Sequence, residues 1–109
     1  MHELAITQSI VDTVIAKLPG TRIAAVQLEI GGLSGVVADS VRFCFSLVAE
    51  GTDLEGATLD ITEPHARCRC ETCGAQFEPD GPIPMCACGS AAITVLSGQD
   101  LKITSVKVA

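Results

Sequence analysis

The sequence predicts an α+β fold in which two helices pack on a small three-stranded sheet. Two segments show the apolar periodicity of helices, three show the alternation typical of strands, and one stretch before the last strand is crowded with cysteine, proline and glycine. With 109 residues and 48% apolar residues, the chain can build one small core, and a domain of this size benefits from an additional staple.

The first helix and the first strand follow one another at the start of the chain. Residues 3–18 repeat apolar positions at helical spacing, and Pro19-Gly20 ends the segment. The apolar face of this helix consists of Leu4, Ile10, Val11, Val14, Ile15 and Leu18. Residues 22–31 alternate apolar and polar side chains as a strand does, and Gly31-Gly32 ends that alternation.

The second helix is expected to begin after Asp39-Ser40, which together form a plausible N-cap, and to end before Gly51. Its spacing makes Cys44 a small buried hydrophobe. Residues 58–62 and 100–108 alternate as strands, and residues 93–98 are compatible with a short one. The alternation slips between residues 103 and 106, which predicts a β-bulge near Thr104-Ser105.

Charge and composition exclude several classes of function. Thirteen acidic against seven basic residues give a formal charge of −6, and only 3% of residues are aromatic, which argues against a nucleic-acid partner. No segment has the apolar length of a membrane span, and the N-terminus lacks the features of a signal peptide, so we expect a cytoplasmic protein without a membrane partner. No catalytic or phosphate-binding motif is present, and an enzyme is not expected.

The cysteine-rich insert has the spacing of a metal site. Cys70 and Cys73 form C-x-x-C-G, and Cys86 and Cys88 form a tighter C-x-C-G. In a reducing compartment, paired cysteines followed by glycine favour a metal over disulfides, and four thiolates are typical of structural Zn²⁺. The insert is therefore predicted to be zinc-ribbon-like. Cys68 and His65 are rival ligands that could replace Cys86.

Iron suits the same four-thiolate geometry, so a rubredoxin-like iron protein is one alternative. A structural zinc-ribbon adaptor is another. We expect residues 65–97 to form the zinc-binding domain, and residues 1–64 plus 98–109 to form the α+β domain.

The first three residues, Met-His-Glu, form a potential chelator of a different kind. The α-amine of Met1, the amide nitrogen of His2 and its imidazole can reach one ion through fused small rings, and Glu3 could add an oxygen. Nitrogen-rich planar donor sets suit Ni(II) or Cu(II) better than Zn²⁺. A solvated histidine at the start of an ordinary helix is the simpler interpretation of these residues.

Four segments in order support a family resemblance: MHE at the start, IGGLSGVVADSVRFCF in the middle, CRCETCG followed by CACGS, and VLSGQDLKITSVKV at the end. Together they resemble the HypA family of hydrogenase nickel-incorporation proteins over essentially the whole chain. The C-x-C of the second cysteine pair departs from the usual C-x-x-C, which affects the zinc geometry expected but not the presence of the site.

The resemblance implies a cytoplasmic nickel metallochaperone that delivers Ni(II) to [NiFe]-hydrogenase during maturation. It implies a transferable nickel ion at Met1, His2 and Glu3, with His2 essential, and structural zinc in the cysteine domain. Asp39 matches most nearly an acidic residue near nickel in some members. The implied partners are a maturation GTPase of the HypB type and the hydrogenase large subunit, with the urease system served in some organisms.

Overall fold

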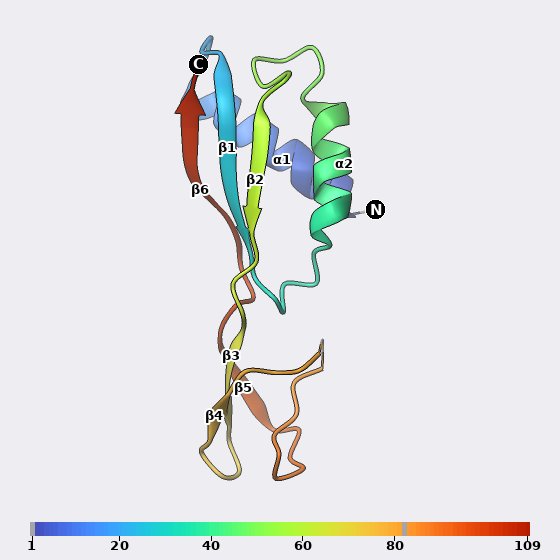
Figure 1. Cartoon of the computed structure of the whole chain (residues 1–109), viewed down its shortest axis with the longest axis vertical. Helices are drawn as coiled ribbons and strands as arrows, with labels where there is room; N and C mark the ends of the chain where they lie inside the picture. The colour runs from blue at the N-terminus through green and yellow to red at the C-terminus, as the bar shows by residue number, and fades with distance from the viewer. Residues whose placement is uncertain (1, 82) are drawn as a thin grey trace. The chain divides into compact units, whose positions relative to one another are not determined.

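The computed structural model describes residues 2–81 and 83–109, and for His2 it describes the backbone only. Its elements, in order, are α1 (His2–Lys17), β1 (Ile23–Ile30), α2 (Ala38–Val48), β2 (Thr58–Thr62), β3 (Arg67–Cys70), β4 (Gln76–Phe77), β5 (Ile93–Ser97) and β6 (Leu101–Val108) (Figure 1). The predicted α+β class, with two helices and a three-stranded sheet of the expected strands, is confirmed.

The chain folds as two compact units. The first comprises Met1–Glu29, Val36–Thr62 and Lys102–Ala109, and the second comprises Ile30–Gly35 and Glu63–Leu101. None of the helices in the part of the chain that the structure describes is both long and apolar enough to cross a membrane.

The sheet of the first unit has the strand order β2-β1-β6. Strands β1 and β2 are parallel, with Ala25 opposite Thr58 and Leu28 opposite Ile61, and β6 points the opposite way to β2 in Figure 1. Parallel neighbours need a crossover connection, and α2 lies in the connection between β1 and β2. The helix is therefore positioned by the pairing of the two strands that flank it.

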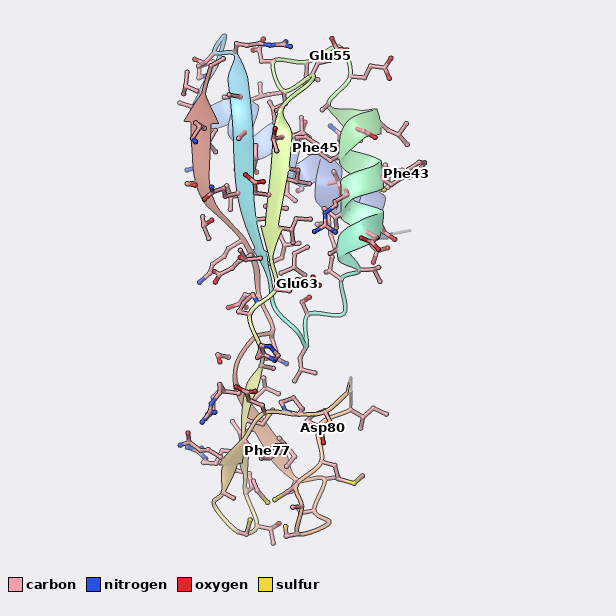
Figure 2. The ribbon with its side chains drawn as sticks, viewed as in Figure 1. Phe43, Phe45, Glu55, Glu63, Phe77 and Asp80 are labelled. Carbon is pink, nitrogen blue, oxygen red and sulfur yellow. The ribbon has the colours of Figure 1, made fainter. Side chains whose placement is uncertain are left out.

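The core of the first unit lies between the two helices and one face of the sheet. Helix α2 contacts both α1 and β2. Figure 2 shows Phe45 directed from α2 toward the strands and Phe43 directed away from them. The buried apolar side chains of this core include Val11, Val14, Ile23, Val26, Leu28, Val41, Phe45 and Leu54.

The start of α2 and the burial of Cys44 differ from the sequence prediction. The N-cap is Val37, without a side-chain cap, and Asp39 lies inside the first turn, where its carboxylate accepts a 2.8 Å hydrogen bond from Arg42. Burial of Ala38 on the face that also carries Val41 and Phe45 explains the earlier start. Cys44 is only half-buried, so its predicted burial was wrong.

The second unit contains a small antiparallel sheet of order β4-β3-β5. Strand β5 was expected, whereas β3 and β4 were not. The segment from Ile30 to Gly35 joins this unit through backbone hydrogen bonds, with Gly32 N–H donating to Pro64 at 3.0 Å and Leu33 N–H donating to Gly98 at 2.8 Å.

The last strand loses its alternation at the predicted place. Thr104 and Ser105 are both exposed, whereas Ile103 and Val106 are half-buried. The hydroxyl of Thr104 donates to the Gln27 carbonyl at 3.2 Å, and that of Ser105 donates to the Gln27 side-chain oxygen at 2.8 Å. The bulge itself stays a prediction, but the change of face occurs where the sequence pattern slips.

Candidate metal centre

Four cysteine side chains of the second unit converge on one point. The sulfurs of Cys70, Cys73, Cys86 and Cys88 all lie within 4.8 Å of one another. Cys70 Sγ is 3.7 Å from Cys88 Sγ, and Cys73 Sγ is 3.6 Å from Cys86 Sγ. These separations are far longer than the disulfide bond length of about 2.0 Å, and all four cysteines are free thiols.

Two glycine turns bring the sulfurs together. Gly74 has a φ of 76° and donates its N–H to the Cys70 carbonyl at 2.8 Å, and Gly89 has a φ of 89° and donates to the Cys86 carbonyl at 2.9 Å. Residues with a side chain rarely adopt such φ values, which explains why glycine follows each cysteine pair.

A direct contact joins the two turns. The hydroxyls of Thr72 and Ser90 lie 2.8 Å apart, within hydrogen-bonding distance, so each turn fixes the position of the other.

The distances between the sulfurs fit a tetrahedral metal ion. Four sulfurs each about 2.3 Å from a central Zn²⁺ lie about 3.8 Å from one another. The two measured separations of 3.6 and 3.7 Å are close to this value. The tighter C-x-C of the second turn therefore does not prevent a four-sulfur site, and the cluster is able to bind a metal such as zinc.

The electrostatics of the cluster favour thiolate formation at one position and oppose it at another. Hydrogen bonding from the Cys73 N–H, 3.5 Å from the Cys70 sulfur, lowers the pKa of Cys70 to about 6. The Ala75 amide lowers the pKa of Cys73, but the sulfurs of Cys86 and Cys70 outweigh it, so that pKa is raised. A divalent cation would relieve this conflict, because it stabilises all the thiolates together.

The two rival ligands lie outside the cluster. Cys68 is buried in β3, where it stands opposite Phe77 of β4 and Val95 of β5. His65 is 82% exposed, and its Nδ1 lies 3.9 Å from a Glu78 carboxylate oxygen. Among the His, Cys, Asp and Glu residues that the structure describes, only the four clustered cysteines converge closely enough to hold an ion.

Of the residues predicted to bind nickel, Met1 and the side chain of His2 lie outside the described part of the chain. Glu3, in the first turn of α1, and Asp39, in the first turn of α2, line one open pocket of about 410 Å³ in the first unit. Leu4, Ser40, Phe43 and Cys44 complete its lining.

Glu3 was predicted as a possible oxygen donor from its place beside His2, whereas Asp39 was placed near nickel only through the family resemblance. Sequence analysis did not place Cys44 in their neighbourhood, because Cys44 has the spacing of a core residue. The pocket follows from the packing of α1 against α2, which no local motif encodes.

Comparison with known proteins identifies the family. A family model described as "Hydrogenase/urease nickel incorporation, metallochaperone, hypA" matches residues 1–108. A protein of Nostoc sp. strain PCC 7120 called hydrogenase maturation factor HypA is 43% identical over 108 residues, covering 99% of this chain and 96% of the relative. A protein of the same name from Geobacter metallireducens is 43% identical over 109 residues, covering 99% of each chain.

Solved structures resemble this one in fold. The solution structure of the Ni metallochaperone HypA from Helicobacter pylori superposes with a TM-score of 0.64 at 20% identity, covering 97% of this chain and 96% of that one. Another solution structure of a HypA protein gives a TM-score of 0.62 at 19% identity. With the match to the family model and the relatives above 40% identity, it follows that the chain belongs to the HypA family of hydrogenase and urease nickel-incorporation metallochaperones, which are maturation factors and not catalytic enzymes.

Proposed function

We propose that the chain carries Ni(II) at its N-terminus and delivers it to [NiFe]-hydrogenase during maturation. The proposed nickel ligands are the α-amine of Met1, the amide nitrogen and imidazole of His2, and the carboxylate of Glu3, with Asp39 as an additional oxygen donor. The observation that supports this proposal is the shared pocket of Glu3 and Asp39, in which two carboxylates from different helices line one space beside the first turn of α1.

The start of α1 suits such a chelate. The first four N–H groups of an α-helix have no intrahelical acceptor, so the His2 amide can release its proton to solvent and bind a metal through nitrogen without breaking a bond of the helix. A helix N-terminus carries partial positive charge, which by itself disfavours a cation. The carboxylates of Glu3 and Asp39 offset that charge, and a planar set of nitrogen donors favours Ni(II) over Zn²⁺.

We further propose that Zn²⁺ is bound by Cys70, Cys73, Cys86 and Cys88 and has a structural role. When bound, it supplies four strong bonds to the two turns that carry the cysteines. A closed four-thiolate site retains its ion, whereas a terminal site built partly of backbone atoms releases its ion easily. In this proposal, the second unit therefore retains its zinc ion, whereas the first unit carries a nickel ion that can be transferred.

Membership of the family implies contact with the hydrogenase maturation machinery. We propose a maturation GTPase of the HypB type and the hydrogenase large subunit as the partners, and the urease system where one is present. Transfer would proceed by ligand exchange, in which thiolates of the target replace the amine, amide and imidazole one after another.

The test of the nickel site is a calorimetric titration of untagged protein with Ni(II). His2→Ala should abolish the high-affinity site, whereas His65→Ala removes the other histidine of the chain, which is exposed in the second unit, and should leave it intact. Extra residues added before Met1 should also abolish the site by converting the amine into an amide. Unchanged stoichiometry and affinity in His2→Ala would reject the proposal.

The same preparation tests the zinc assignment. Elemental analysis should find one zinc per chain, and the protein should be colourless. A visible iron–thiolate absorption band would instead support the rubredoxin-like alternative, and zinc without any uptake of nickel would leave only a structural zinc adaptor.

A further inference from the structure

The outer face of α2 carries apolar side chains that the fold does not use. Phe43 is 67% exposed and Leu47 is 53% exposed, and their spacing of four residues places them next to each other on the helix. The inner face of the helix already buries Ala38, Val41 and Phe45. Figure 2 shows Phe43 directed away from the strands, on the side of α2 opposite to Phe45.

This face is continuous with the pocket of Glu3 and Asp39. Phe43 lines that pocket together with Leu4 of α1, which is itself 46% exposed. Leu4, Phe43 and Leu47 thus form one apolar patch from two helices, which we call the α2 patch. Isolated exposed apolar residues are common, but an aromatic residue with apolar neighbours beside a pocket that also carries carboxylates is typical of a protein interface.

Carboxylates flank the apolar pair at both ends of the helix. Asp39 lies one turn before Phe43, and its side chain is 93% exposed. Glu50 lies one turn after Leu47, where Ala49 still has helical dihedral angles. Arg42 is the only basic residue of the helix and already donates to Asp39.

With Glu3, the surroundings of the patch hold three carboxylates and one guanidinium, in a chain whose formal charge is −6. This arrangement fits a partner groove that is apolar in the middle and basic at its ends. A second copy of the chain fits it poorly, because two acidic surfaces would face each other.

We propose that the α2 patch is the docking surface for the protein that receives or exchanges nickel, and that this partner offers an apolar groove bordered by lysine or arginine. The inference rests on the proposed function in one respect: ligand exchange requires the acceptor to approach the start of α1 within bonding distance. Leu4 and Phe43 of the α2 patch line the pocket there, and the other lining residues are Glu3, Asp39, Ser40 and Cys44. A partner held on Phe43 would reach Glu3 across a single pocket.

The test uses the full-length nickel-loaded chain with the purified maturation GTPase and, separately, the purified hydrogenase large subunit. Phe43→Ala should weaken binding to at least one of them by about tenfold or more, mainly by faster dissociation. Ile83→Ala is the matched control, since it removes a 77% exposed apolar side chain from the second unit and should change nothing. Glu50→Gln should slow association and reduce its dependence on ionic strength.

Nickel titration of Leu47→Ala separates this proposal from the proposed function. Leu47 belongs to the α2 patch but lies outside the lining of the pocket, so Leu47→Ala should weaken partner binding while its affinity for Ni(II) equals that of the unaltered chain. The proposal is overturned if both proteins bind Phe43→Ala and the unaltered chain equally, or if neither binds the unaltered chain. It is also overturned if Leu47→Ala loses nickel, if Phe43→Ala melts earlier than the unaltered chain, or if sedimentation shows a homodimer that Phe43→Ala dissociates. If His2→Ala loses nickel but binds the partner as the unaltered chain does, both the nickel site and the separate docking surface are supported.

Discussion

Gly98→Ala should strongly destabilise the second unit. Gly98 follows β5 with a φ of 90°, and a Cβ placed there would overlap Ala66 Cα, lie 2.8 Å from its Cβ and 3.0 Å from its nitrogen. The opposing atoms belong largely to backbone, which cannot rotate away. The Gly98 carbonyl also accepts a hydrogen bond from the Leu33 N–H at 2.8 Å. The same carbonyl occupies the space that a Cβ on Gly31 would need.

The destabilisation has two sources that can be estimated separately. A non-glycine residue at positive φ costs about 1–2 kcal/mol. Forcing a methyl group into a filled space costs a further 1–3 kcal/mol or so, more where backbone must move. The sum is about 2–5 kcal/mol, and since 1 kcal/mol shifts the melting temperature of a small domain by about 4–8 °C, we expect a decrease of at least about 8 °C.

Thermal unfolding of the zinc-loaded protein measures this effect, and Gly35→Ala isolates its first component. Gly35 belongs to the same unit and has a φ of 76°, but a Cβ there would have no atom within 4 Å. Gly35→Ala should therefore lose only about 1–2 kcal/mol. If both variants melt at the same temperature, the steric argument is wrong, and if Gly98→Ala also loses nickel binding, the two units are not independent.

Two further predictions concern the metal centre. Cys73→Ser should lower zinc affinity by more than the 10–100-fold typical of outer-shell changes, whereas Cys44→Ser, which alters a half-buried cysteine outside the cluster, should keep one zinc per chain by elemental analysis. Acid should release the metal. The Cys70 pKa is lowered from its ordinary value of 9.0 to about 6, so the Cys70 thiolate stabilises the folded state fully above pH 9.0, and this contribution is lost as the pH falls through about 6. A chelating dye should report retention at pH 7 and release between about pH 6 and 4, and zinc retained below that range would contradict the role of the Cys70 thiolate.

The elements with strong periodic signals could be predicted from the sequence, and those with mixed signals could not. The alternation of residues 58–62 predicted β2 with its observed bounds, because half-buried strands show their pattern directly. Strand β3 was missed, although Arg67–Cys70 alternates exposed and buried side chains, because its two cysteines were considered only as ligands. The start of α2 was misplaced because Asp39-Ser40 has the composition of a cap, whereas the burial of Ala38 decided the outcome.

The same distinction between local and distant information applies to the two candidate metal sites. Cys70 and Cys73 are three residues apart, so one glycine turn brings their sulfurs together and the spacing alone predicts a site. Glu3 and Asp39 are 36 residues apart in the sequence, and they line one pocket only through the tertiary fold. The parallel pairing of β1 and β2 requires a crossover, which contains α2, and α2 then packs on α1. The donors proposed at Met1 and His2 are, moreover, all nitrogens that any chain with a histidine at position 2 possesses. A carrier site of this kind therefore has almost no local sequence signature, and its chemistry depends on which surface the fold brings to the first turn of α1.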